Sequence, residues 1–122
     1  MAKIMIVDDS AYARRVHRAM LERAGHVVIE AATGTTALES FTLERPDIVV
    51  LDLSMEDIGG LDVLRTIRSL DAEARVIVVS ADVQRSTDNA VMAAGATSFV
   101  AKPASEEGLT AAIDEALQSR PS

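Results

Sequence analysis

The sequence predicts an α/β domain in which helices cover both faces of a five-stranded parallel sheet. Short aliphatic runs recur five times along the 122 residues, and each gap between them has room for one crossover helix. Several runs are apolar at every position, as is typical of parallel strands buried on both faces. A chain of this length is expected to form one domain.

The predicted strands are the aliphatic runs themselves. They span residues 4–7, 27–29, 48–51, 76–79 and 99–101. Strands that alternate with helices form a doubly wound sheet with right-handed crossovers. The flavodoxin-like strand order 2-1-3-4-5, with five helices, is favoured for so short a chain. Ligands of such sheets bind beyond the carboxyl ends of the strands, where the winding reverses.

The first helix is marked at both ends and along one face. Ser10 can cap its N-terminus, and Gly25 follows its last turn. Its expected inward residues are Ala13, Val16, Met20 and Ala24. Its basic residues, Arg14, Arg15 and Arg18, are expected to form a solvated face that a kinase could contact.

The remaining helices carry similar signals. The second is expected over residues 35–44, where Pro46 prevents continuation, and the third over 61–70. The last begins after Ser105, which can cap an apolar stripe at helical spacing. The fourth, within 83–94, has the fewest apolar anchors, so we expect it to move most easily.

Composition narrows the classes of function. Twelve Lys and Arg against nineteen Asp and Glu give a net charge of −7, which disfavours direct binding to nucleic acid or anionic membranes. The chain has no Cys, so disulfides, thiolate metal sites and thiol nucleophiles are excluded. No apolar run approaches the ~18 residues of a membrane span, and no signal peptide is evident. A cytoplasmic location is therefore expected.

Polar and charged side chains close four of the five predicted strands. They are Asp8 and Asp9 after the first strand, Asp52 after the third, Ser80 after the fourth and Lys102 after the fifth. Because the carboxyl ends of parallel strands share one edge, these side chains are expected to converge. Lys102 is one of only two lysines in the chain, so general surface usage does not explain it.

Three converging carboxylates indicate a hard divalent cation. They would repel one another unless one were protonated or a cation bound. Oxygen ligands without His or Cys favour Mg²⁺, held by Asp8, Asp9 and Asp52. Asp52 ends the central strand and is also the candidate nucleophile, forming an aspartyl-phosphate. Lys102 and the Ser80 hydroxyl would then hold phosphoryl oxygens.

These residues resemble the receiver domain of two-component response regulators, most of all its stand-alone chemotaxis type. The resemblance rests on Val7-Asp8-Asp9, Asp52-Leu53-Ser54-Met55, Ser80-Ala81 and Lys102-Pro103, and it covers residues 3–119. It implies that a histidine kinase phosphorylates Asp52 with Mg²⁺, and that the backbone carbonyl of Ser54 is a further metal ligand. It also implies a switch at Ser80 and Phe99, which changes the surface of helix 4, strand 5 and helix 5 to bind a protein target.

The pathway stays open at this point. A single receiver domain over 1–122 without an output domain would act on a protein target such as a flagellar motor switch, or serve as a phosphorelay intermediate or phosphate sink. A phosphatase could be a further partner, and the protein could be a monomer or a phosphorylation-linked dimer. We do not expect it to be an enzyme, because the only reactions it would catalyse are its own phosphorylation and dephosphorylation.

Three positions depart from the family pattern. Glu56 replaces a usual Pro, Gly59 a usual Asp or Asn, and Ala104 a frequent aromatic residue. The first two changes are expected to loosen the loop after the third strand. The Glu56 side chain is expected to face solvent rather than the metal.

Other interpretations fit the residues less well. Asp8 and Asp9 could be turn residues only, and Phe99 could be plain core. An aspartate-nucleophile phosphatase of the haloacid dehalogenase type needs a second Asp two residues after its nucleophile, but Ser10 and Ser54 occupy those positions. A flavin-binding module needs aromatic residues around the ring, and these make up 2% of the chain.

Overall fold

The computed structural model describes residues 2–53, 59–80, 90–101 and 105–118. The predictions made at Ser54, Glu56, Lys102 and Ala104 lie outside these ranges. The five strands are β1 (Lys3–Val7), β2 (Val27–Ala31), β3 (Ile48–Asp52), β4 (Arg75–Ser80) and β5 (Ser98–Ala101). They form one parallel sheet in the order β2-β1-β3-β4-β5, which confirms the predicted topology.

Helices follow the strands as expected. They are α1 (Ala11–Arg23), α2 (Gly34–Glu44), α3 (Gly60–Leu70) and α5 (Glu106–Gln118), and residues 90–93 are also helical. The predicted start of the fourth helix lies outside the described residues.

Within the described part of the chain, no helix has both the length and the apolar character that crossing a bilayer requires.

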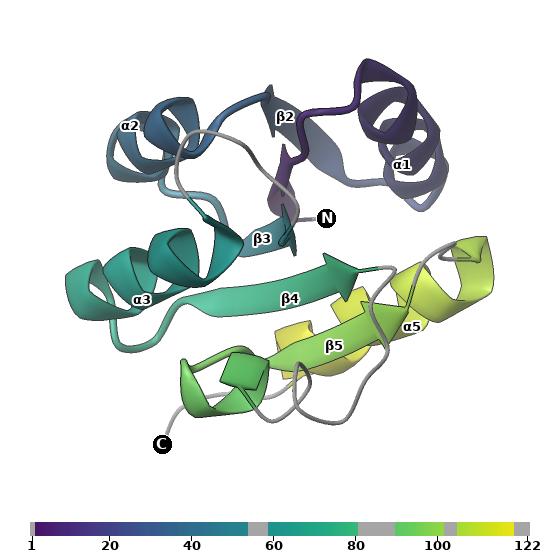
Figure 1. Ribbon diagram of the computed structural model, residues 1–122. Coiled ribbons are helices and arrows are strands. Elements are labelled where there is room, and N and C mark those ends of the chain that lie inside the picture. The colour runs from purple at the N-terminus through teal and green to yellow at the C-terminus, as the bar shows by residue number, and fades with distance from the viewer. Residues whose placement is uncertain (1, 54–58, 81–89, 102–104, 119–122) are drawn as a thin grey trace.

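The sheet separates two hydrophobic cores, and Figure 1 shows α1 and α5 on the opposite side from α2 and α3. Consecutive strand residues enter different cores, because side chains alternate across a strand. Thus Val49 packs toward α2 and α3, while Val50 packs toward α1 and α5. Every residue of β3 is buried, which explains why its sequence is apolar without alternation up to Asp52.

The helix ends agree with their sequence signals. The Ser10 hydroxyl accepts a hydrogen bond from the Ala13 amide at 3.1 Å, and the Ser105 hydroxyl accepts one from the Gly108 amide at 2.9 Å. Gly25 has a φ of +91°, a conformation that favours glycine after a helix. The Ser10 cap therefore fixes the start of α1 close to the end of the first strand.

The inward face of α1 differs from the prediction. The helix buries His17 and Leu21, whereas Val16 and Met20 lie half-buried beside them and Ala24 is exposed. The buried row is spaced by four residues and so lies on one face. The prediction is confirmed for Met20, which packs against the core on the side of α1 and α5. It was wrong for Ala24 and left out Leu21. It missed His17 because it considered only apolar residues, whereas His17 is a buried polar residue with a partner of its own.

Candidate functional site

The carboxyl ends of β1 and β3 lie side by side at the centre of the sheet. Val7 is the register partner of Leu51, so the residues that follow them, Asp8 and Asp52, emerge next to each other. The Asp8 amide still donates to the carbonyl of Ala31 on β2 at 3.1 Å, which extends the pairing by one bond. The hydrogen bonding between β1 and β2 therefore continues to the first residue after the strand.

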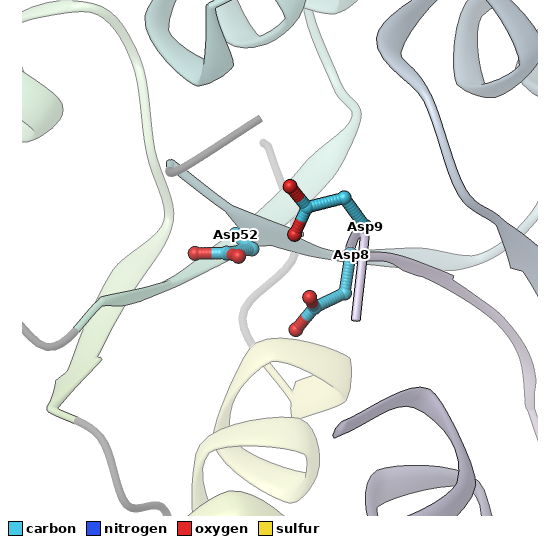
Figure 2. A group of neighbouring side chains, drawn as sticks. All are labelled: Asp8, Asp9 and Asp52. Carbon is cyan, nitrogen blue, oxygen red and sulfur yellow. The ribbon is translucent and has the colours of Figure 1, made fainter. Parts of the chain in front are cut away.

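Three carboxylates meet at this edge, as Figure 2 shows. One oxygen from each of Asp8, Asp9 and Asp52 lies within 4.8 Å of the others. Asp8 and Asp52 are 2% and 5% exposed, whereas Asp9 is exposed. The predicted acidic cluster is confirmed as a spatial group, with two buried members and one that faces solvent.

The donor set of this cluster fits Mg²⁺. All three ligand atoms are carboxylate oxygens, and the cluster contains neither His nor Cys. Hard oxygen ligands of this kind suit Mg²⁺, which is usually bound by few carboxylates and keeps positions for water or phosphate oxygens. A divalent cation would also offset the mutual repulsion of three negative charges, two of them shielded from solvent.

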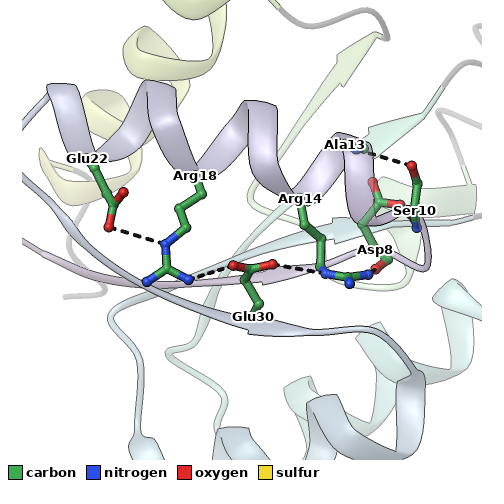
Figure 3. A network of polar contacts seen from close by, with 7 residues as sticks. All are labelled: Asp8, Ser10, Ala13, Arg14, Arg18, Glu22 and Glu30. Carbon is green, nitrogen blue, oxygen red and sulfur yellow. Dashed lines mark hydrogen bonds and ion pairs between the residues drawn. The ribbon is translucent and has the colours of Figure 1, made fainter.

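Asp8 is held through its side chain and its carbonyl. One carboxylate oxygen accepts a hydrogen bond from the Ser10 amide at 2.9 Å. The Asp8 carbonyl accepts one from Nη1 of Arg14 at 2.7 Å, as Figure 3 shows. Arg14 also donates through Nε to Glu30 on β2 at 3.0 Å. The turn that carries two of the three carboxylates is thus tied to its own helix and to a neighbouring strand.

Charges of opposite sign continue this network along α1. Arg18 donates to Glu30 at 2.6 Å and to Glu22 at 3.2 Å. The hydrogen bond from Arg18 lowers the pKa of Glu30 the most, and the hydrogen bond from Arg14 lowers it further. Hydrogen bonds to Glu30 and Glu22 raise the pKa of Arg18. The prediction of a solvated basic face was wrong for Arg14, whose side chain is only 18% exposed and is bonded on two sides.

Ser80 and Phe99 occupy the neighbouring strands β4 and β5. Asp52 is the register partner of Val79, so Ser80 comes one residue further along on the strand next to it. Ser80 is 2% exposed, and the partly buried Phe99 packs against the core on the side of α2 and α3. The structure therefore brings Ser80 to the edge of the sheet that carries the acidic cluster.

Comparisons with known proteins agree with this arrangement. Residues 4–114 match the model of the response regulator receiver domain. The chemotaxis protein CheY of Bacillus subtilis is 36% identical over 94% of this chain and 97% of its own length. The transcriptional regulatory protein KdpE of Mycobacterium tuberculosis is 38% identical over 84% of this chain but only 45% of its own length.

Solved structures give the same result. The CheY-like receiver domain protein of Methanospirillum hungatei superposes with a TM-score of 0.91 at 25% identity, covering 97% of this chain and 94% of that one. The similarity therefore covers nearly all of this chain. The chain belongs to the family of response regulator receiver domains.

Proposed function

We propose that this protein accepts a phosphoryl group from a histidine kinase on Asp52 and then binds a protein target. The observation that supports this most strongly is the convergence of Asp8, Asp9 and Asp52 at one edge of the sheet. Asp52 is the central candidate because it is buried and ends β3, the middle strand. A carboxylate in that position can act as the nucleophile of a phosphoryl transfer.

The transfer step balances as a simple substitution at phosphorus. A carboxylate oxygen of Asp52 attacks the phosphorus of a phosphohistidine, forming a P–O bond as the P–N bond breaks. The electron pair of the broken bond stays on the imidazole nitrogen. That nitrogen takes up a proton from solvent, so the leaving group is neutral imidazole. The product is an aspartyl-phosphate, a mixed anhydride.

The other proposed site residues stabilise charge around this step. Asp8, Asp9 and Asp52 would hold Mg²⁺, together with the backbone carbonyl of Ser54. When bound, the ion supplies positive charge that offsets the charge of the phosphoryl oxygens. In the same proposal, Lys102 pairs with one phosphoryl oxygen and the Ser80 hydroxyl donates to another.

The response to phosphorylation is proposed to run through β4 and β5. Ser80 gains a hydrogen bond by moving toward the phosphoryl group, and that movement gives Phe99 room to turn inward. The surface of the fourth helix, β5 and α5 then changes shape for a protein target. The expected observable is a different Phe99 rotamer in a phosphoryl-mimic state, measured by side-chain NMR.

A role in chemotaxis is the favoured setting. The match to the Bacillus subtilis chemotaxis protein over nearly the full length of both chains supports it. A flagellar motor switch protein would then be the target, and a phosphatase would reset the signal in the cytoplasm. Phosphate-dependent binding to the motor switch protein supports this role, whereas onward transfer to a second histidine identifies a phosphorelay intermediate or sink.

The acceptor role is tested with a small phosphodonor. Wild-type protein is incubated with acetyl phosphate with and without Mg²⁺, and its intact mass is recorded beside that of Asp52→Ala. The expected result is a mass gain of one phosphoryl group that requires Mg²⁺, is lost on alkaline hydrolysis and is absent from the variant. Asp114→Ala, on the exposed side of α5, is the matched control and should label normally. Equal labelling of Asp52→Ala would contradict the proposal.

A further inference from the structure

We propose that Arg14 is a positioning residue for the metal site, acting through the peptide bond that joins Asp8 to Asp9. This inference rests on the proposed Mg²⁺-dependent function of the acidic cluster and adds a residue of α1 to it. The residue itself does not touch the cation. It holds the backbone from which two of the three carboxylates extend.

The contacts of Arg14 tie two separate elements together. Its Nη1 donates to the Asp8 carbonyl at 2.7 Å, and its Nε donates to Glu30 on β2 at 3.0 Å. Figure 3 shows the guanidinium lying between these two acceptors. A planar guanidinium presents several donors in a fixed fork, so one side chain can satisfy both at once.

Glu30 is in turn held from its other side. Its second carboxylate oxygen accepts from Arg18 at 2.6 Å, and Arg18 also bonds to Glu22 at 3.2 Å. Glu30 therefore stands as a fixed anion between two arginines. Its position leaves Arg14 little freedom to swing away from the Asp8 carbonyl, and the low exposure of Arg14, 18% of its side chain, agrees with this.

The orientation of the Asp8 carbonyl affects both Asp8 and Asp9. A peptide unit is planar, so the carbonyl of Asp8 and the amide of Asp9 turn together. The Asp8 amide is bonded to Ala31, and the Ser10 amide is bonded to the Asp8 carboxylate. Fixing the intervening carbonyl with Arg14 sets the direction in which both carboxylates leave the chain. Partners behind a metal ligand commonly affect metal affinity in this way.

Positioning and simple electrostatics predict opposite effects on Mg²⁺ binding. Removing a guanidinium near the cluster removes repulsion toward a cation and on charge alone raises Mg²⁺ affinity. Removing the positioning bond lowers it, because the two carboxylates lose their preset orientation. The sign of the change in affinity therefore separates the two roles.

The test measures Mg²⁺ affinity of this chain by NMR titration of backbone amides, for wild type, Arg14→Ala, Arg14→Lys and Arg15→Ala. We expect Arg14→Ala to weaken Mg²⁺ binding about tenfold. Arg14→Lys keeps the positive charge but lacks the planar guanidinium that bonds two acceptors at once. We therefore expect its Mg²⁺ affinity to lie between those of wild type and Arg14→Ala. Arg15→Ala is the matched control, since it removes the same charge from an exposed position on the same helix. Its affinity should be unchanged or higher.

The outcomes separate this inference from the proposed function. Wild-type affinity, or higher affinity, in Arg14→Ala overturns the positioning role and leaves the proposed function standing. Absence of Mg²⁺ binding by the wild type overturns both. Thermal unfolding without Mg²⁺ shows whether each variant is folded, and if Arg14→Ala is not, Arg14→Lys decides by the same criterion.

Discussion

Asp8 and Asp52 extend from adjacent strands and bring carboxylate oxygens within 4.8 Å of each other while both residues are almost fully buried. Repulsion between two carboxylates at this distance and depth opposes folding. A bound cation reverses that effect, and so does the loss of one charge. The site should therefore reveal itself in stability measurements as well as in chemistry.

Replacing Asp9 with Ala should change stability in opposite directions with and without Mg²⁺. Without Mg²⁺, the variant should unfold at a higher temperature than wild type, because one of three repelling charges is gone. With Mg²⁺ at about ten times the wild-type dissociation constant, wild type should gain about 1.4 kcal/mol, and the variant far less. Thermal unfolding followed by circular dichroism measures both effects.

Asp114→Ala provides the control for this experiment. It removes an exposed carboxylate from α5 and should leave the Mg²⁺-induced stabilisation at the wild-type value. The interpretation fails if Asp9→Ala is stabilised by Mg²⁺ as much as wild type is.

The close approach of α3 to the end of β3 makes Gly60 sensitive to any side chain. A Cβ there would lie 2.5 Å from the Cα of Leu53 and 3.0 Å from the carbonyl oxygen of Asp52. Gly60→Ala should therefore destabilise the fold by about 1–3 kcal/mol, the usual range for overpacking. Denaturant unfolding measures this loss.

The neighbouring glycine offers a matched control. Among the described residues, a Cβ at Gly59 would meet only Asp62, at 3.9 Å, and Gly59 caps α3 without a side-chain hydrogen bond. Gly59→Ser should be neutral or should stabilise by a few tenths of a kcal/mol, since Ser is a preferred N-cap. Equal destabilisation by both substitutions would show that packing against Asp52 is not the cause.

The contribution of Glu30 to stability should depend on pH. Hydrogen bonds from Arg18 and then Arg14 lower its pKa below the ordinary 4.5. A group with a lowered pKa in the folded state stabilises the protein above its unfolded pKa and loses that contribution as pH falls. Glu30→Gln should thus be less stable than wild type at pH 7, and the difference should shrink below pH 4.5.

Parallel urea titrations across this pH range measure the difference. Glu39→Gln, exposed on α2, makes the same chemical change away from the arginines and serves as the control. A Glu30→Gln difference that stays constant between pH 7 and pH 3 would contradict the assigned ion pairs.

Ser80→Ala should slow phosphoryl uptake from acetyl phosphate. A hydrogen bond to a charged group is worth about 1.5 kcal/mol or more, which corresponds to roughly a tenfold lower rate. Ser80→Thr keeps the hydroxyl and should retain a rate near that of wild type. Rates come from intact mass recorded against time, and equal rates for Ser80→Ala and wild type would remove this residue from the site.

The sheet and its acidic cluster could be predicted because their signals lie in short stretches of sequence. Five apolar runs define the strands, and parallel pairing brings Asp8, Asp9 and Asp52 together without any detail of side-chain packing. Caps at Ser10 and Ser105 are equally local, since each hydroxyl bonds within its own first turn.

Interactions between distant segments could not be predicted in this way. The pairing of Arg14 with Glu30 depends on how α1 lies against β2, and nothing in the spacing of these two residues indicates it. The burial of His17 likewise follows from the packing of α1 on the sheet. The predicted roles of Lys102 and Ser54 stay predictions, because both residues lie outside the described part of the chain.

The most direct measurement locates the phosphoryl group itself. Protein labelled with acetyl phosphate and Mg²⁺ is treated with borohydride, which reduces an acyl phosphate to an alcohol, and the digested peptides are sequenced by mass spectrometry. The account predicts that the reduced residue is Asp52 and no other. Modification at Asp8 or Asp9, or a phosphoryl group that resists borohydride because it sits on His17, would contradict it.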